Sequence, residues 1–156
     1  MKLKLFLFAF LFVFLSCSSD DETTSNEVSL VGTWELSSAK GSLSLDLNQD
    51  GLTSNSLLDE LPCYKHTIVV KDDNTFTEES IGVKVDAEVT SAITAECLDT
   101  FLNKEGGWAL DKDRLTFGYV PADDTKTVTI VVTETTLSFT DNFEGLGSLA
   151  LEFTRK

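Results

Sequence analysis

Apolar and polar residues alternate in short segments along most of the chain after residue 30. In residues 31–36, Trp34 and Leu36 fall on one face of an extended chain, and Thr33 and Glu35 fall on the other. This period of two is typical of a half-buried strand. The same pattern recurs at residues 43–47, 65–71, 75–79, 82–90, 108–110, 115–119, 127–133, 136–140 and 148–154. About eight or nine short strands joined by tight turns predict an all-β fold, either an antiparallel up-and-down barrel or a sandwich.

Helical periodicity is confined to short stretches. In residues 55–61, three leucines share one helical face, and Pro62 predicts the end of a short helix there. Lys40 and Gly41 predict a bend between the first two strand segments. Residues 91–103 stay open between a helix and an irregular loop or strand, because their apolar spacing is roughly helical but their threonine content is not.

The first residues of the chain have the pattern of an export signal. Lys2 and Lys4 precede residues 5–15, an apolar run of 11 residues that is too short to span a bilayer as a helix. The sequence Phe-Leu-Ser-Cys at residues 14–17 follows and resembles the lipobox of bacterial lipoproteins. That resemblance implies a signal peptide at residues 1–16 and acylation of Cys17, for example with palmitate. The alternative is an ordinary secretory signal with an incidental cysteine.

An acidic, Ser/Thr-rich stretch separates Cys17 from the first strand. Its start, Ser-Ser-Asp-Asp-Glu at residues 18–22, resembles the sorting signal of surface-exposed lipoproteins of some Gram-negative bacteria. The resemblance implies an outer-membrane lipoprotein that faces outward, with residues 17–29 as a flexible tether. The alternative is a solvated linker with no address, since such a composition cannot bury enough apolar surface to fold.

The remaining 127 residues, 30–156, are expected to form one domain. The net charge of the chain excludes one class of partner. The chain carries a formal net charge of -14 at pH 7 with 26 acidic and 12 basic residues. Phosphate backbones are bound by clustered Lys and Arg, and the sequence has no such cluster. Nucleic acid is therefore not an expected partner.

Two cysteines follow the tether, Cys63 and Cys97. In an exported protein such a pair predicts a disulfide, here between positions 34 residues apart. A metal pair would lack nearby His or Cys partners, and a nucleophile would lack a base other than His66.

The pattern Asp-x-Asn-x-Asp-Gly at residues 46–51 places oxygen ligands at alternate positions before a glycine, as the first half of a calcium loop requires. Leu57 stands at the twelfth position, where an EF-hand needs a bidentate Glu, so the full motif is incomplete. The predicted ligands of a structural calcium ion are Asp46, Asn48, Asp50, the main-chain carbonyl of Leu52, Asp59 and Glu60. The alternative is a tight turn with solvated carboxylates.

Catalytic motifs find little support in the sequence. His66 is the only histidine and lies in a strand-like run, where a partly exposed neutral imidazole is the commoner case. A glycosidase needs two carboxylates that face each other across a cleft. Because the chain has 26 acidic residues, their number alone cannot indicate whether such a pair exists. We therefore do not expect an enzyme, and a hydrolase that uses carboxylates of residues 46–60 is kept only as a third hypothesis.

Three features together resemble the lipocalin-like domains of small bacterial surface lipoproteins. They are Gly32-x-Trp34, the pair Gly107-Trp108-x-Leu110 and Leu115-Thr116-Phe117, and Arg155 at the end of the last strand. The resemblance implies a barrel in which Trp34 closes the base and Arg155 packs over it, with Gly32 beside them. It also implies a lipid-anchored binding or accessory module for a small apolar ligand.

Whether such a barrel has room for a ligand depends on its aromatic residues, which more often fill a small barrel than line a pocket. These residues are Trp34, Phe76, Trp108, Phe117, Tyr119, Phe139 and Phe153. We expect a filled core to be the commoner outcome. The alternative function is a structural envelope protein with a calcium-stabilised loop and a protein or glycan partner.

Overall fold

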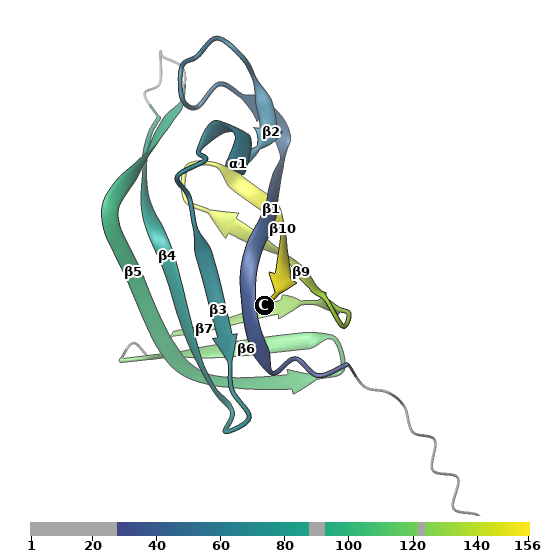
Figure 1. The fold of residues 1–156 in the computed structure, drawn as a ribbon. Coiled ribbons are helices and arrows are strands. Elements are labelled where there is room, and N and C mark those ends of the chain that lie inside the picture. Colours follow the sequence, from purple (N-terminus) through teal and green to yellow (C-terminus); the bar gives the residue numbers. More distant parts are fainter. Residues whose placement is uncertain (1–27, 88–92, 122–123) are drawn as a thin grey trace, which may run out of the picture.

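A computed structural model of the chain describes residues 28–87, 93–121 and 124–156. These residues form one antiparallel sheet that curls into a nearly closed barrel (Figure 1). The strands are β1 (Gly32–Leu45), β2 (Ser54–Ser56), β3 (His66–Val70), β4 (Thr75–Asp86), β5 (Thr94–Asp111), β6 (Arg114–Val120), β7 (Asp124–Thr129), β8 (Val131–Val132), β9 (Thr136–Phe143) and β10 (Gly147–Arg155). The helix α1 (Leu57–Glu60) is short. The predicted all-β, antiparallel barrel with one short helix is confirmed.

Strands that are neighbours in sequence are mostly neighbours in the sheet, which gives the up-and-down topology. The order is β7-β6-β5-β4-β3-β1-β10-β9-β8, with β2 paired to β1 off this path. The first strand, β1, also pairs with the last, β10. In this ladder Leu36 lies opposite Phe153 and Trp34 lies opposite Arg155. Among the described strands, no ladder joins β7 to β9, so the barrel has one open seam.

The core follows from the alternation that the sequence shows. On β10, Leu149, Leu151 and Phe153 are buried, whereas Glu152 between them is exposed. Trp34 and Phe153 are 0% exposed and Phe76 is 1% exposed, so the largest side chains fill the interior completely at their positions. Burial of such apolar surface is the main force that closes a sheet of this kind.

Local sequence signals were overridden where strands pair over a long distance. The predicted bend at Lys40 and Gly41 is absent, since these residues pair with Ala150 and Leu149 of β10 and β1 continues to Leu45. Residues 75–79 and 82–86 of these two predicted strands belong to one strand, β4, whose register shifts between Ile81 and Val83. Residues 88–90 of that prediction lie outside the described residues.

In two further segments, the structure either decides between the alternatives that the sequence left open or differs from the sequence prediction. Most of the ambiguous residues 91–103 form the first half of β5, while residues 91 and 92 lie outside the described residues. The strand predicted at residues 127–133 is divided at Ile130 into β7 and β8, because the Ile130 amide donates to the carbonyl of Asp113 at 2.7 Å and leaves the sheet ladder. The helix predicted at residues 55–61 is confirmed but shorter.

The segment between β1 and β3 covers one end of the barrel. Figure 1 shows α1, β2 and the loop before them at the end opposite to the start of β1. At the N-terminus of α1, the hydroxyl of Ser56 accepts a hydrogen bond from the Asp59 amide at 3.3 Å, which satisfies one of the free donors of the first turn. Within the described part of the chain, no helix is long and apolar enough to cross a membrane.

Candidate functional site

Three polar side chains meet inside the barrel. His66 is on β3, Glu78 on β4 and Tyr119 on β6, and all three occupy inward positions in the alternation of their strands. The His66 Nε2 atom lies 2.9 Å from Oε1 of Glu78, and the Tyr119 hydroxyl donates to Oε2 of Glu78 at 3.2 Å. The side chains of His66 and Glu78 are only 4% and 12% exposed. Glu78 is therefore a nearly buried carboxylate held from two sides.

His66 has one nitrogen without a partner. Its Nδ1 atom is buried and has no hydrogen-bond partner among the described residues. The ring packs edge-on against Phe153, with centroids 5.1 Å apart, and is 6% exposed as a residue. The sequence predicted a partly exposed histidine, and this prediction is wrong, because the alternation along β3 places His66 among core residues.

A cavity lies next to the three polar side chains of His66, Glu78 and Tyr119. It has a volume of about 400 Å³, and His66, Glu78 and Tyr119 belong to its lining. Volumes of about 300 to 1,000 Å³ are usual for small-molecule sites. Apolar side chains form part of the wall, namely Ile81, Val83, Val85, Leu102 and Phe143. The interior is thus hollow at this level, although the sequence favoured a filled core over a useful pocket.

The aromatic residues explain why only one part of the barrel is hollow. Phe76 and Phe117 pack edge-on at 4.7 Å between centroids, and Phe139 stacks on Phe153 at 5.4 Å. These rings fill the interior, whereas Tyr119 reaches the cavity with its hydroxyl on Glu78. Trp108 is only partly buried and donates its indole N–H to the carbonyl of Lys71 at 3.0 Å.

The electrostatics of the cavity centre on Glu78. Burial alone would raise the pKa of its carboxyl group. The hydrogen bond and charge of His66, with the charges of Lys126 and Lys104, outweigh that effect and lower the pKa from 4.5 to about 2. Burial raises the pKa of Tyr64 and Tyr119 well above the ordinary value, and the charge of Glu78 raises both further. At neutral pH the cavity therefore holds an ionised carboxylate and two neutral phenols.

An ion pair crosses the open seam of the barrel at the cavity wall. Lys126 on β7 and Asp141 on β9 approach to 2.5 Å between Nζ and Oδ2, and their side chains are 26% and 21% exposed. The same ammonium lies 5.5 Å from the centroid of Phe139. This contact links two strands that share no ladder, so a side-chain pair replaces backbone hydrogen bonds there.

The structure brings the predicted barrel-base residues together at the other end of the strands. The guanidinium carbon of Arg155 lies 4.1 Å from the centroid of the Trp34 ring, a cation–π distance. Arg155 also donates to the carbonyl of Val31 at 2.7 Å and to the carbonyl of Glu134 at 2.8 Å. A Cβ atom on Gly32, whose φ is +153°, would lie 2.5 Å from Nη1 of Arg155. A side chain at this position would force the guanidinium to shift, and the positive φ is strained for any residue other than glycine.

The predicted disulfide is confirmed. Cys63, which follows α1, is bonded to Cys97 on β5, with 6.3 Å between the two Cα atoms. The bond ties the segment that covers the barrel end to the long β4–β5 hairpin. Cys17, the predicted lipidation site, lies outside the described residues.

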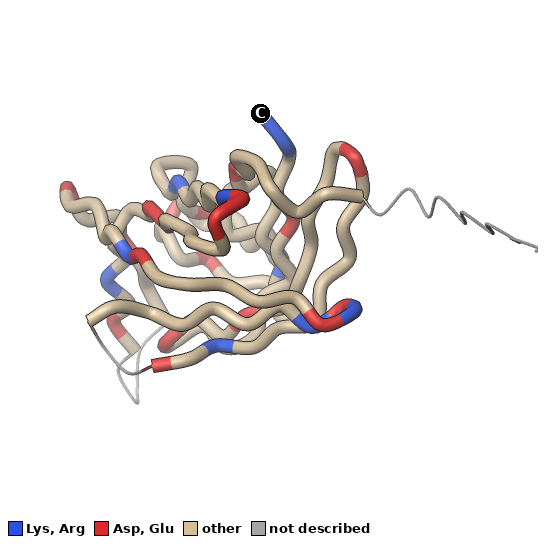
Figure 2. Tube along the Cα trace, turned by 90° about the horizontal axis from the view of Figure 1, so that it is seen from below, with Lys and Arg blue, Asp and Glu red and all other residues tan. Residues whose placement is uncertain are grey.

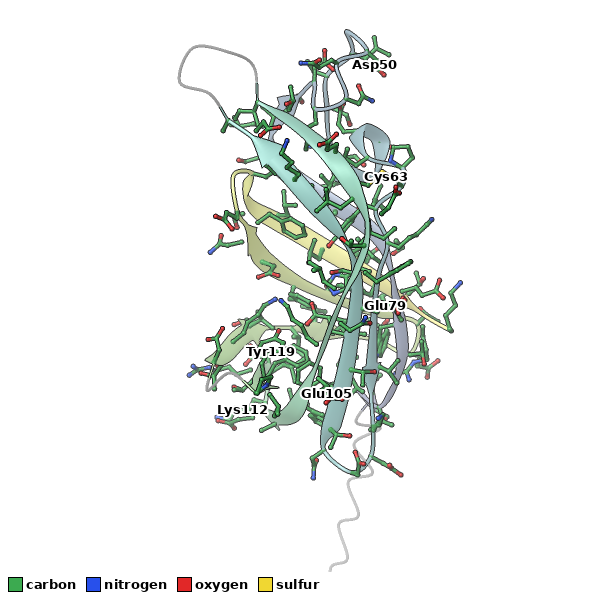
Figure 3. The ribbon with its side chains drawn as sticks, turned by 90° about the vertical axis from the view of Figure 1, so that its left-hand side faces the viewer. Asp50, Cys63, Glu79, Glu105, Lys112 and Tyr119 are labelled. Atoms are coloured by element: carbon green, nitrogen blue, oxygen red, sulfur yellow. A yellow bond between two sulfur atoms is a disulfide. The ribbon has the colours of Figure 1, made fainter. Side chains whose placement is uncertain are left out.

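The acidic loop predicted to bind calcium folds around its own backbone. The two carboxylate oxygens of Asp46 accept hydrogen bonds from the amides of Asp50 and Gly51, at 3.1 and 3.0 Å. Asn48 Oδ1 accepts from the Asp50 amide at 3.0 Å, and Asp50 Oδ1 accepts from the Leu52 amide at 2.8 Å. Asp46, Asn48 and Asp50 are therefore gathered in one turn. Figure 3 shows Asp50 at the end of the molecule opposite to Lys112.

The other two predicted calcium ligands are engaged elsewhere. Asp59 accepts from the hydroxyl of Ser54 at 2.9 Å, and Glu60 is 4% exposed and accepts from the amide of Leu47 at 2.8 Å. In the described part of the chain, no group of three or more His, Cys, Asp or Glu side chains is placed to hold a metal ion. Calcium binding by this loop stays a prediction.

A second hollow lies on the outer face of the sheet. It has a volume of about 570 Å³ and is lined by side chains of β3, β4 and β5, among them Thr67, Thr77, Glu79, Asn103 and Glu105. Figure 3 faces this side of the sheet and shows Glu79 and Glu105 on it. Its lining is rich in hydroxyl, amide and carboxylate groups. It is larger than the interior cavity and shares Glu78 and Lys104 with it, but its lining residues are all exposed or half-buried, as in a groove at the surface.

Sequence reasoning missed most of the interior polar group, although the signal was present. Glu78 is two positions from Phe76, Lys126 is two from Val128, and Asp141 is two from Phe139. In each strand the charged residue has the same inward phase as a buried apolar residue. A charge in the inward phase of a strand indicates a polar interior site, because exposure cannot explain it.

Comparisons with known proteins add little to this geometry. No family model matches the chain, and no curated protein matches it. Among solved structures, the fold is similar to that of an uncharacterized protein from Bacteroides eggerthii, with 11% sequence identity and a TM-score of 0.43. The match covers 82% of this chain and 100% of that chain.

Proposed function

We propose that this protein is a lipid-anchored, surface-exposed lipocalin-like module that holds a small ligand in its barrel. The observation that carries the proposal is the interior cavity of about 400 Å³, which combines an apolar wall with the ionised Glu78 and the unpartnered Nδ1 of His66. A barrel interior that served only stability would be filled with apolar side chains, as it is around Phe76 and Phe117.

The anchoring part of the proposal rests on the sequence. The lipobox-like residues 14–17 supply the acyl chains at Cys17, and the acidic residues 18–22 supply the address for the outer surface of the outer membrane. The described chain begins beside Trp34 and Arg155, so the anchor would attach to the end of the barrel that these two side chains fill, opposite to α1 (Figure 1). The end that carries α1 and the Asp46 loop would then face away from the membrane.

The test of anchoring uses Cys17. The full chain is expected to sediment with membranes and to resist extraction by salt, and Cys17→Ala is expected to be soluble, because the lipid supplies the attachment. Intact cells treated with a protease would lose the protein if it faces outward. Sedimentation of Cys17→Ala with membranes would contradict the lipid anchor.

The test of ligand binding uses the mature chain without its lipid, residues 18–156. The neutral fluorescent probe N-phenyl-1-naphthylamine is expected to brighten on binding in the cavity. Val83→Trp, which fills the cavity, should abolish that signal, whereas Val131→Trp, at a position 65% exposed, should not change it. Equal signals from both variants, or none from the unaltered chain, would refute the cavity as a binding site.

The outer groove supports a second candidate, a structural envelope protein with a protein or glycan partner. Phe101 on β5 is 59% exposed and Val120 on β6 is 63% exposed, and the groove beside them is lined with hydrogen-bonding groups. Failure of the probe to bind, together with loss of an envelope interaction in Phe101→Ser, would favour this candidate over the first.

A further inference from the structure

The charges around the interior cavity are unequal. Four carboxylates belong to the lining, those of Glu78, Asp124, Asp141 and Glu144. At most three positive groups of the lining oppose them, the ammonium groups of Lys104 and Lys126 and the imidazole of His66. Lys126 is engaged with Asp141, and His66 lies against Glu78. The lining therefore has an excess of negative charge that a bound cation would balance.

The tyrosines that line the cavity report the same potential. After burial, the charge of Glu78 is the largest cause that raises the pKa of Tyr64 and of Tyr119, and Asp141 raises both as well. The carboxylates thus dominate the field at two separate points of the wall. A group with positive charge is stabilised by that field, and an anion is repelled by it.

Aromatic faces in the cavity region already hold ammonium groups of the chain itself. Lys104 Nζ lies 5.3 Å from the centroid of Tyr119, and Lys126 Nζ lies 5.5 Å from the centroid of Phe139. Both distances fall within the range in which a ring attracts a cation. The chemistry that binds an organic ammonium, a carboxylate beside an aromatic face, is therefore present.

The remaining wall is apolar. Val83, Val85, Ile81 and Phe143 line the same cavity. We propose that the cavity binds a small amphipathic cation, with its ammonium group near Glu78 and Asp141 and its hydrocarbon part against these side chains. This inference rests on the proposed function and specifies the class of ligand.

The experiment compares three competitors that each contain eight carbon atoms: octylammonium, octanoate and octanol. Each compound is added at neutral pH, below its own critical micelle concentration, to residues 18–156 that carry the bound neutral probe. The displacement of the probe is then measured. Octylammonium is expected to compete at least about tenfold better than octanoate, since the ionised lining attracts one head group and repels the other. Octanoate competing as well as octylammonium would overturn the inference while leaving the proposed function intact. Absence of probe binding would instead refute the proposed function.

Variants separate the cavity from the general negative charge of the protein, whose Asp and Glu residues occur in many parts of the trace (Figure 2). Glu78→Gln is expected to weaken competition by octylammonium, and Lys104→Gln is expected to strengthen it, because they change the charge of the lining in opposite directions. Glu152→Gln is the matched control, since it removes one carboxylate from the outer face of β10. If Glu78→Gln does not fold, Asp124→Asn at an exposed position of the lining replaces it. Equal effects of the cavity and control variants would contradict the inference.

Discussion

Protonation of Glu78 should make the stability of the barrel fall in acid. In the folded chain burial would raise the pKa of this carboxyl group, but His66, Lys126 and Lys104 lower it to about 2 from the ordinary value of 4.5. Because the pKa is lower in the folded state than in the unfolded state, the ionised group stabilises the fold above about pH 4.5. That contribution is lost as the pH falls through about 2.

The size of the effect follows from the two pKa values. A lowering from 4.5 to about 2 corresponds to about 3 kcal/mol of stability at neutral pH. By about pH 3 the unfolded chain is almost fully protonated at this position, so about 2 kcal/mol of that contribution is already lost. The Glu78 side chain is only 12% exposed, so solvent screens this interaction little.

Urea unfolding of residues 18–156 at pH 6 and at pH 3 measures this loss. The unaltered chain is expected to lose about 2 kcal/mol more than Glu78→Gln between these two values, because the amide cannot titrate. Glu79→Gln, on the exposed outer face of the same strand, is the matched control and should follow the unaltered chain. If the free energies of unfolding of Glu78→Gln and the unaltered chain decrease in parallel, the ionised Glu78 does not stabilise the fold.

Three further predictions concern other parts of the molecule. Trp34→Ala should lower the free energy of unfolding by about 3 to 5 kcal/mol, because the ring is fully buried beneath Arg155; a nearly neutral result in urea unfolding would place it outside the core. Replacing Cys63 and Cys97 by serine should cost about 3 to 4 kcal/mol through the entropy of a 34-residue separation, and an unchanged melting temperature would argue against that contribution. Calcium in about hundredfold excess over its Kd should add about 2.7 kcal/mol if the Asp46 loop binds it, whereas a melting curve identical with calcium and with chelator would leave the loop as a turn.

The barrel could be predicted because its signal is repeated many times. Each strand needs only its own alternation, and β10 shows how directly Leu149, Leu151 and Phe153 map onto the core. The disulfide was predictable for a similar reason, since two cysteines leave only one pairing. Strand boundaries were less predictable at Lys40 and at Ile130, where partners distant in sequence decide whether the ladder continues.

The site was harder to predict because it is assembled from four elements. His66, Glu78, Tyr119 and Asp141 come from β3, β4, β6 and β9, and no two of them form a motif in the sequence. Their phase in each strand indicates only that they point inward. Which of them meet depends on the registers of β3, β4, β5 and β6 against one another, and on the seam at which Lys126 reaches Asp141.

The two ends of the barrel interior differ in a way that stability alone does not explain. Around Trp34 the interior is filled, and Arg155 lies over the ring and donates to backbone carbonyls. Around Glu78 the barrel encloses charged side chains and a hollow. Replacing buried charges of this kind by apolar side chains is often neutral or stabilising. Ionised Glu78 stabilises the fold relative to a protonated carboxyl group, but apolar side chains at all of these positions would be expected to stabilise it about as well. The polar group is therefore better explained by the ligand that the cavity is proposed to bind, and a sequence that filled this level with leucine would be expected to fold well and bind nothing.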